Sequence, residues 1–189
     1  MQKDLDSYVK VYKQFIPKIV CETTVTELET NCDWSNHAYY SPKTDAFTSY
    51  DKEFSLCYNE NIITHNSLMQ KTWDAINEYV TNDLKFDWFN GWNGFSSPRY
   101  NRYTKNTLMK EHCDHIHSMF QGSPKGIPIL TVLGCLNEDY VGGDLIMFQD
   151  KTIEMKTGDI VIFPSNFLYP HKVTEITEGT RYTFVSWVT

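Results

Sequence analysis

Two histidines and a carboxylate are the residues of this chain whose types and spacing suggest metal chemistry. His112 and Asp114 are separated by one residue, and His171 and Arg181 follow far downstream. Two histidines and one carboxylate occupy one face of an octahedral Fe(II) ion and leave other positions open, as oxygen activation requires. A structural zinc site is instead closed by four protein ligands. The set therefore predicts a non-haem iron site, beside which Arg181 offers a planar, charged partner for an acidic co-substrate.

The choice of ligands needs support beyond this tripeptide, because most histidines at surface turns bind nothing. His115 and His117 are also candidates and allow a different set of ligands. Residues two apart in a strand point to the same face, so His112 and Asp114 can reach one ion from the end of one strand. Adding His171 requires a fold that gathers the ends of several strands.

The elements that must hold these side chains differ between the two halves of the chain. In the first half, apolar residues at near-helical intervals predict a helix over 67–84, and 15–28 is a shorter mixed segment. Residues 32–59 are polar and rich in tyrosine, which predicts irregular or edge-strand structure. Two interpretations of that segment stay open: a solvated surface connection with half-buried tyrosines, or a lid over a site.

From about residue 99 the pattern becomes that of a β protein, with short β-rich runs separated by turn signals. The predicted strands are Ile127–Leu136, Asp144–Phe148, Thr152–Met155, Asp159–Phe163 and Tyr182–Val188. We expect a mainly β, α+β fold, a barrel or two-sheet jelly roll with amino-terminal helices packed on one sheet. Residues 1–189 are expected to form one domain, in which 1–98 supplies supporting helices and substrate-side loops and 99–189 the jelly-roll core.

The composition disfavours several classes of partner. Lys and Arg total 17 against 24 Asp and Glu, a net charge of -7, which argues against a nucleic-acid-binding surface. The amino terminus lacks the apolar segment of a signal peptide, and no later run approaches the roughly 20 apolar residues of a membrane span. We expect a cytoplasmic protein with no membrane partner. Five scattered cysteines without a CxxC predict reduced thiols rather than a disulfide framework or a zinc knuckle.

Seven short motifs in a fixed order place the metal ligands in a wider pattern. They are Tyr103, His112-x-Asp114, Leu136-Asn137, Gly142-Gly143-Asp-Leu-x-x-Phe148, Gly158-Asp-x-x-x-Phe163, Pro170-His171-x-Val173 and Gly179-x-Arg181-Tyr182. Over about residues 99–188 the chain resembles the catalytic domain of the prolyl 4-hydroxylase type of Fe(II)- and 2-oxoglutarate-dependent dioxygenases. The resemblance implies a double-stranded β-helix.

The resemblance also implies a set of cofactors and the residues that hold them. The cofactors are Fe(II), 2-oxoglutarate and O2, with ascorbate as reductant. His112, Asp114 and His171 correspond to the iron ligands, and Arg181 to the residue that binds the distal carboxylate of 2-oxoglutarate. Tyr103 matches a tyrosine that hydrogen-bonds the co-substrate, although a packed core tyrosine is an equally open interpretation.

Two further positions near the site are compared with the family. Trp187 shares strand parity with Arg181 and corresponds to a tryptophan near the reactive site, where it either fills the core or forms a substrate wall. Cys135 stands where relatives carry a tyrosine that helps to hold the distal carboxylate. We expect its missing hydroxyl to be replaced by Thr131 or Thr183, or not at all.

For the substrate, the resemblance favours a proline-containing protein or peptide, hydroxylated to 4-hydroxyproline with release of succinate and CO2. Aromatic side chains suited to an extended peptide, or to core packing, are Tyr39, Tyr40, Trp88, Phe89, Trp92, Phe95 and Tyr100. The alternatives are hydroxylation of a free amino acid or other small molecule and an inactive jelly-roll binding protein. Nucleic-acid demethylation is disfavoured, because Trp187 stands where alkylation-repair relatives have a second arginine.

Overall fold

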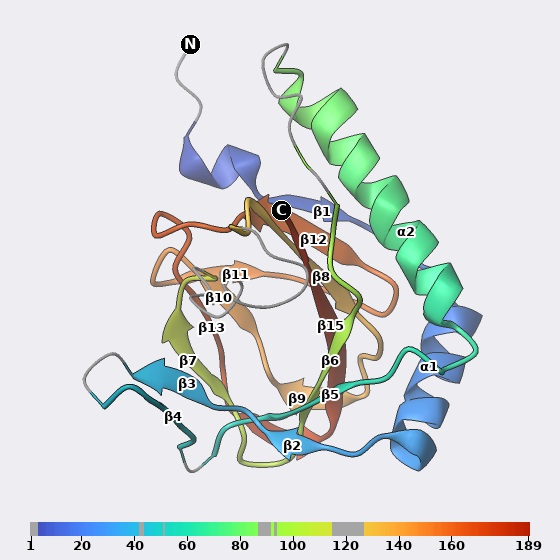
Figure 1. The fold of residues 1–189 in the computed structure, drawn as a ribbon, viewed down its shortest axis with the longest axis vertical. Coiled ribbons are helices and arrows are strands. Elements are labelled where there is room, and N and C mark those ends of the chain that lie inside the picture. The colour runs from blue at the N-terminus through green and yellow to red at the C-terminus, as the bar shows by residue number, and fades with distance from the viewer. Residues whose placement is uncertain (1–3, 42–43, 51, 87–91, 93, 115–126) are drawn as a thin grey trace.

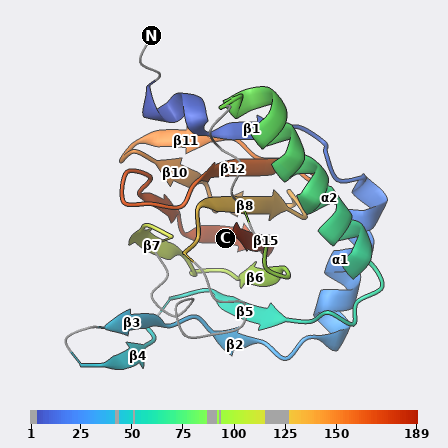
Figure 2. The same cartoon turned by 45° about the horizontal axis from the view of Figure 1, so that its top comes forward.

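A computed structural model describes residues 4–41, 44–50, 52–86, 92, 94–114 and 127–189. Within these ranges, antiparallel strands form two larger sheets that face each other (Figures 1 and 2). The larger sheet runs in the order β1 (Lys10–Tyr12), β12 (Ile160–Pro164), β8 (Leu130–Cys135), β15 (Arg181–Val188), β6 (Arg99–Tyr103), β5 (Ser55–Tyr58) and β2 (Ser35–Asn36). The smaller sheet runs in the order β11 (Lys151–Ile153), β10 (Leu145–Met147), β13 (His171–Val173) and β7 (Met109–His112).

Two strand pairs and the helices complete the described part of the fold. β9 (Tyr140–Gly142) pairs with β14 (Ile176–Gly179), and β3 (Tyr39–Ser41) pairs with β4 (Ala46–Thr48). The helices are the 3-10 turn η1 (Leu5–Tyr8), α1 (Lys18–Asn31), α2 (His65–Glu78) and the π-helical turn η2 (Tyr79–Leu84). Helices α1 and α2 lie together on one side of the larger sheet (Figures 1 and 2).

The alternation of side chains along β15 separates two hydrophobic cores. Tyr182 and Phe184 belong to the core that the larger sheet shares with the helices, together with residues such as Leu28 of α1. Val185 and Trp187 belong to the core between the two sheets. Successive residues of a strand face opposite sides, so one strand serves both cores. The expected mainly β jelly roll with amino-terminal helices on one sheet is confirmed.

The structure differs from the sequence-based expectations at several boundaries. The helix expected over 67–84 is α2 followed by η2, and the mixed segment 15–28 is the regular helix α1, which begins after Pro17. Residues 32–59 contain β2, β3, β4 and β5, so this segment extends the larger sheet and forms a hairpin beside the smaller one. Whether it closes as a lid stays a prediction.

The cysteines also differ from expectation. Cys32, which caps the end of α1, forms a disulfide with Cys57 on β5, while Cys21, Cys113 and Cys135 are free. The expectation of reduced thiols throughout is wrong for this pair, because the two cysteines meet only once α1 packs on the sheet. No helix in the described ranges is long and apolar enough to cross a membrane.

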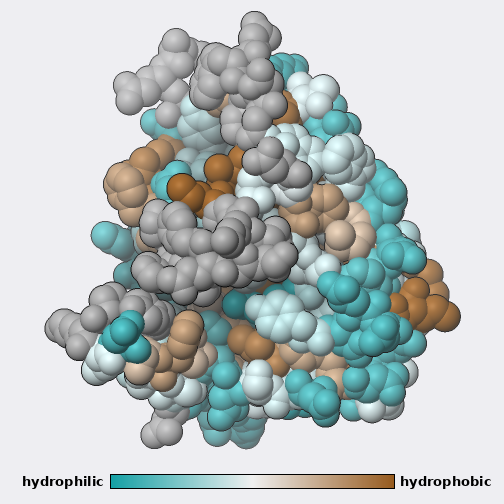
Figure 3. Space-filling model, viewed as in Figure 1, coloured by the Kyte–Doolittle hydropathy of each residue, from teal (hydrophilic) through white to brown (hydrophobic). Residues whose placement is uncertain are grey.

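The surface carries separate exposed apolar side chains. Figure 3 shows hydrophobic areas with hydrophilic ones between them on the face of Figure 1. Exposed examples are Phe47 on β4, Ile63 just before α2 and Phe167 between β12 and β13. Single exposed apolar residues are usual on protein surfaces and do not by themselves define an interface.

Candidate metal centre

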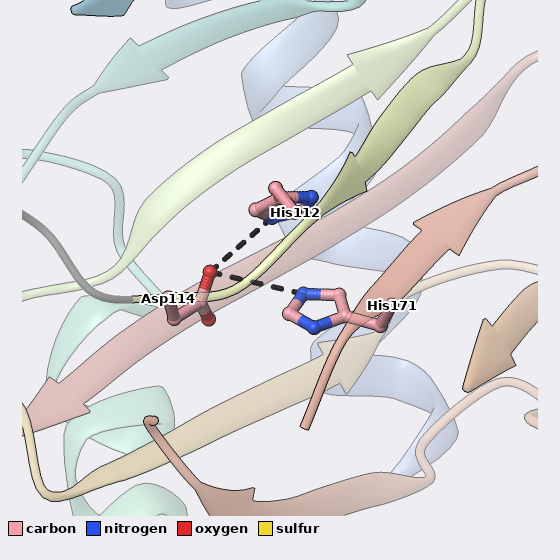
Figure 4. A group of neighbouring side chains, drawn as sticks. All are labelled: His112, Asp114 and His171. Carbon is pink, nitrogen blue, oxygen red and sulfur yellow. Dashed lines mark ion pairs between the residues drawn. The ribbon is translucent and has the colours of Figure 1, made fainter. Parts of the chain in front are cut away.

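His112, Asp114 and His171 meet between the two sheets (Figure 4). His112 ends β7 and His171 begins β13, and the antiparallel pairing of these strands sets the two histidines opposite each other. Asp114 Oδ1 lies 3.3 Å from His112 Nε2 and 3.7 Å from His171 Nε2. One candidate ligand atom from each residue lies within 4.8 Å of the other two. The three side chains therefore converge on one point.

Backbone carbonyls orient both imidazoles. His112 Nδ1 lies 2.8 Å from the carbonyl oxygen of Lys110, and His171 Nδ1 lies 3.1 Å from that of Tyr169. A carbonyl oxygen only accepts, so each Nδ1 carries the proton and each Nε2 keeps a lone pair directed at the centre. His112 Nε2 is buried and has no hydrogen-bond partner in the described part of the chain. This orphaned nitrogen fits a metal ligand.

The Asp114 carboxylate is fixed through its other oxygen. Asp114 Oδ2 accepts hydrogen bonds from Thr131 Oγ1 at 2.8 Å and from Trp187 Nε1 at 3.3 Å, which leaves Oδ1 facing the imidazoles. Burial opposes ionisation, but the neighbouring His171 and His112 and the Thr131 hydroxyl hold the pKa of Asp114 well below its usual range. Burial lowers the pKa of His171, which favours the neutral form that binds metal. Imidazole nitrogens with a carboxylate oxygen suit Fe(II).

Arg181 lies in the same pocket and has no carboxylate partner among the described residues. Its side chain is 1% exposed, and its Nε donates a hydrogen bond to the Tyr140 hydroxyl at 3.3 Å. Burial disfavours the charge, but the Tyr140 and Tyr103 phenols leave the pKa of Arg181 raised. Arg181 Nη1 is buried without a hydrogen-bond partner among the residues described. A buried, charged and partly unpaired guanidinium is suited to an anionic ligand.

The remaining predicted site residues occupy different positions. Tyr103 is buried with its ring 5.1 Å from the Arg181 guanidinium, and its hydroxyl contacts Met109 Sδ at 3.6 Å. Trp187 is on the Arg181 side of β15, as expected from its parity. Thr131 hydrogen-bonds Asp114 rather than Arg181, and Thr183 accepts a bond from Asn101 at 3.5 Å. The structure therefore does not bring either threonine hydroxyl to Arg181.

The hydroxyl at Arg181 comes from Tyr140, which sequence reasoning missed. The Cys135 thiol lies beside it, with Sγ 3.9 Å from the Tyr140 hydroxyl. Gly143 adopts a φ of +69°, and a Cβ there would lie 2.9 Å from Arg181 Cδ. The glycine pair after Tyr140 thus lets β9 pass close to Arg181. In the sequence, the position of Tyr140 shortly before the Gly142-Gly143 pair was the signal that could have identified it.

Of the aromatic side chains expected to form a substrate groove, the structure brings only some near the metal centre. Tyr39 lies near the centre, with its ring 6.4 Å from that of His112. Tyr100 is buried in the core beneath the helices, and Trp92 and Phe95 pack against that core, so these three are not at the centre. The residues that lie outside the described ranges are Trp88, Phe89, His115 and His117.

A family model described as the 2OG-Fe(II) oxygenase superfamily matches residues 98–189. This segment, slightly under half of the chain, is therefore similar to the 2OG-Fe(II) oxygenase superfamily. The match begins one residue before β6 and includes all three converging side chains and Arg181. The strands that build the oxygenase domain thus carry the whole candidate site, while the helices precede it.

Curated relatives of this oxygenase domain are hydroxylases. A PKHD-type hydroxylase of Acinetobacter baumannii is 33% identical over 99 residues, and one of Alteromonas mediterranea is 29% identical over 97 residues. Each alignment covers 48% of this chain and 42% of the relative. The matched region thus spans less than half the length of these relatives.

Solved structures share the fold over almost the whole chain. A Pseudomonas putida prolyl-4-hydroxylase superposes with a TM-score of 0.67 and 15% identity, covering 96% of this chain and 91% of its own. A Trichoplax adhaerens prolyl hydroxylase, in complex with a hypoxia inducible factor peptide fragment, gives 0.71 and 15%, covering 96% and 83%. At these identities the likeness establishes the fold of the oxygenase domain together with its helices.

Proposed function

We propose that this protein is an Fe(II)- and 2-oxoglutarate-dependent dioxygenase that hydroxylates proline in a protein or peptide. One observation carries the proposal: two Nε2 atoms and one carboxylate oxygen converge beside a buried arginine that has no acidic partner among the described residues. When bound, Fe(II), 2-oxoglutarate and O2 supply the oxidising chemistry, in which succinate and CO2 are released and a C–H bond is hydroxylated.

The chain's own residues hold and orient these reactants. His112 Nε2, His171 Nε2 and Asp114 Oδ1 are the atoms that would hold the metal. Arg181 binds the distal carboxylate of 2-oxoglutarate through its unpaired Nη1. Tyr103 packs beneath the guanidinium and keeps the anchor dry, which strengthens the ion pair.

A peptide substrate is supported by neighbouring proteins and by the mouth of the pocket. The Trichoplax adhaerens hydroxylase is a complex with a peptide fragment, and the curated relatives are named hydroxylases. In this chain Tyr39 lies beside His112, and the β3–β4 hairpin extends next to β7 (Figure 1). An extended peptide can pass along such a tyrosine-bearing hairpin.

The test is succinate formation from 2-oxoglutarate by purified protein with Fe(II) and ascorbate, with and without proline-containing peptides, read by mass spectrometry. The proposal predicts peptide-stimulated succinate and a peptide heavier by one oxygen atom. Succinate without a hydroxylated peptide retains the oxygenase and rejects the peptide substrate. No succinate with iron present would revive the inactive binding protein.

Ascorbate and the cytoplasmic location belong to the same proposal. Ascorbate acts as the reductant that keeps the iron ferrous, so omitting it should shorten the period of turnover. The structure has a Cys32–Cys57 disulfide, which a reducing compartment disfavours, so a cytoplasmic location requires this pair to be reduced in the cell. Alkylation of free thiols at cell lysis, followed by peptide mapping, therefore tests the location: a fully oxidised pair would contradict the cytoplasm.

A further inference from the structure

A second arginine, Arg99, lines the metal pocket. It begins β6 and pairs with Val185 of β15, just as Tyr103 of the same strand pairs with Arg181. Arg99, Tyr103 and Arg181 line the pocket that also contains the three candidate metal ligands. The two arginines therefore face one space, Arg181 fully buried and Arg99 half-buried.

The guanidinium of Arg99 is held in place but not neutralised. Its Nε donates to Asn101 Oδ1 at 3.2 Å, and its Cζ lies 4.8 Å from the ring centre of Trp187 and 5.8 Å from that of Phe54. Within the described ranges, no carboxylate lies within ion-pair distance of Arg99, and Asn101 is its only side-chain acceptor. Its remaining N–H donors are thus available to a ligand.

Packing on an aromatic ring does not account for this placement. Arg102, on the same strand, stacks over Trp34 at 4.4 Å on the opposite face of the sheet. That arrangement holds an arginine by a cation–π contact outside the pocket. Arg99 makes the same kind of contact but lines the pocket that contains the three candidate metal ligands.

The charges of the loaded pocket leave Arg99 unbalanced. The charges of Asp114, Arg181, a divalent metal and a dicarboxylate co-substrate cancel one another. The nearby Glu53 accepts a hydrogen bond from Tyr39 at 3.2 Å and forms no ion pair with Arg99. Among the described residues that line the pocket, Arg99 therefore keeps a positive charge without an ion-pair partner, and an anionic group is a ligand that would neutralise it.

We propose that Arg99 binds a carboxylate of the primary substrate. This inference rests on the proposed hydroxylase function and defines its substrate class. Trp187 contacts both Arg99 and the candidate metal ligand Asp114, because its ring lies against Arg99 while its Nε1 donates to Asp114. A carboxylate on Arg99 thus holds the neighbouring part of the substrate beside the metal. The carboxylate is either the carboxyl terminus of a peptide or an acidic side chain next to the proline.

Two matched pairs of peptides test this assignment and separate the two sources. One pair ends in proline, as the free acid or as the amide. The other carries an internal proline followed by glutamate or by glutamine. Hydroxylation and kcat/KM are measured for the wild type and for Arg99→Met, which keeps apolar contact with Trp187 and removes the charge. Arg102→Met is the matched control for loss of an arginine stacked on an aromatic ring, and thermal unfolding checks each fold.

The wild type should prefer the acidic member of one pair by roughly tenfold or more, the contribution of a charge-assisted hydrogen bond. Arg99→Met should lose that preference because KM for the acidic peptide rises, while Arg102→Met keeps the preference. Arg99→Lys keeps the charge but loses the planar guanidinium, so its preference for the acidic peptide should lie between those of the wild type and Arg99→Met. Equal use of both members by the wild type, or an unchanged preference in Arg99→Met, would overturn the assignment.

A failure to hydroxylate any proline peptide would test the proposed function and not the role of Arg99. If no proline peptide is hydroxylated while a free amino acid is, the peptide proposal is wrong. The acid and amide of that amino acid then replace the peptide pairs, and the same comparison between Arg99→Met and Arg102→Met decides the role of Arg99.

Discussion

Tyr140 accepts a hydrogen bond from Arg181 Nε at 3.3 Å, and the two residues come from strands of different sheets, β9 and β15. The contact uses one edge of the planar guanidinium, and Nη1 stays buried without a hydrogen-bond partner among the described residues. Burial raises the pKa of Tyr140 to about 12, so the phenol stays neutral and retains its proton at physiological pH. Tyr140 therefore orients Arg181 without cancelling the charge that would bind 2-oxoglutarate.

Replacing Tyr140 by phenylalanine should weaken 2-oxoglutarate binding about 5- to 100-fold. The variant leaves a charged N–H donor without its acceptor in a buried site, which costs about 1–3 kcal/mol. Calorimetric titration of 2-oxoglutarate into the Mn(II)-loaded protein measures the effect without turnover. Tyr182→Phe is the control, because the Tyr182 hydroxyl contacts Glu29 near the helices instead. Equal losses in both variants would exclude a specific role for Tyr140.

Asp114→Ala should abolish hydroxylation while the fold persists. The variant removes the carboxylate that faces both imidazoles, so the site keeps only two protein ligands. Circular dichroism reports on the fold and metal titration on the site. His115→Ala and His117→Ala should be much milder, and an active Asp114→Ala with an inactive His115 or His117 variant would require a different ligand set.

Arg181→Lys should raise KM for 2-oxoglutarate roughly 10- to 100-fold, because lysine keeps the charge but loses the planar fork. Arg181→Ala should raise it further and also reduce stability, since it empties a fully buried position. Iron should still bind to both variants, as followed by metal titration. Loss of metal binding with KM unchanged would contradict the division between the metal ligands and the anchor.

The candidate ligands could be found from the sequence because their identities and short spacings carry the signal. His112 and Asp114 are separated by one residue at a strand end, and His171 and Arg181 belong to short motifs of their own. The jelly roll followed from alternation and turn residues, which are also local. Side-chain type and local period suggested the ligands and the jelly roll, and the ordered motifs shared with the family decided which histidines were chosen.

Contacts that depend on register or on packing of distant elements were not accessible in the same way. Thr131 reaches Asp114 because β8 pairs with β15 in a register that sets it opposite Trp187. Tyr140 reaches Arg181 through the path of β9, and Cys32 meets Cys57 through the packing of α1. No short-range pattern encodes those registers, so the sequence could not decide whether a threonine hydroxyl reaches Arg181.

Trp187→Phe and Thr131→Val should each weaken metal binding about 10- to 100-fold, a usual loss when a group that orients a ligand is removed. Each variant removes one of the two hydrogen bonds to Asp114 Oδ2 while keeping most of the packing. Ser186→Ala is the control, because the neighbouring Ser186 hydroxyl donates to the Ser96 carbonyl instead. Metal affinity equal to that of Ser186→Ala would show that these bonds do not support the ligand.

The stability of the metal-free protein should depend on the buried His37. Its ring stacks on Phe54 with centroids 4.4 Å apart, and burial, followed by the charge of Arg99, lowers the pKa of His37 to about 3. An unfolded chain protonates histidine near pH 6.5. Between these values the unfolded state binds a proton that the folded state does not, so the free energy of unfolding falls as pH falls.

His37→Gln should therefore flatten the decline of the free energy of unfolding between about pH 6.5 and 3. Denaturant titrations at several pH values, compared with the wild type at each pH, isolate this contribution. Burial raises the pKa of the neighbouring Glu53, whose contribution has the opposite sign and is retained in the variant. His65→Gln, at the start of α2, is the control. Parallel curves for wild type and His37→Gln would mean that His37 is protonated in the folded protein, and its contact with Glu53 would then be an ion pair.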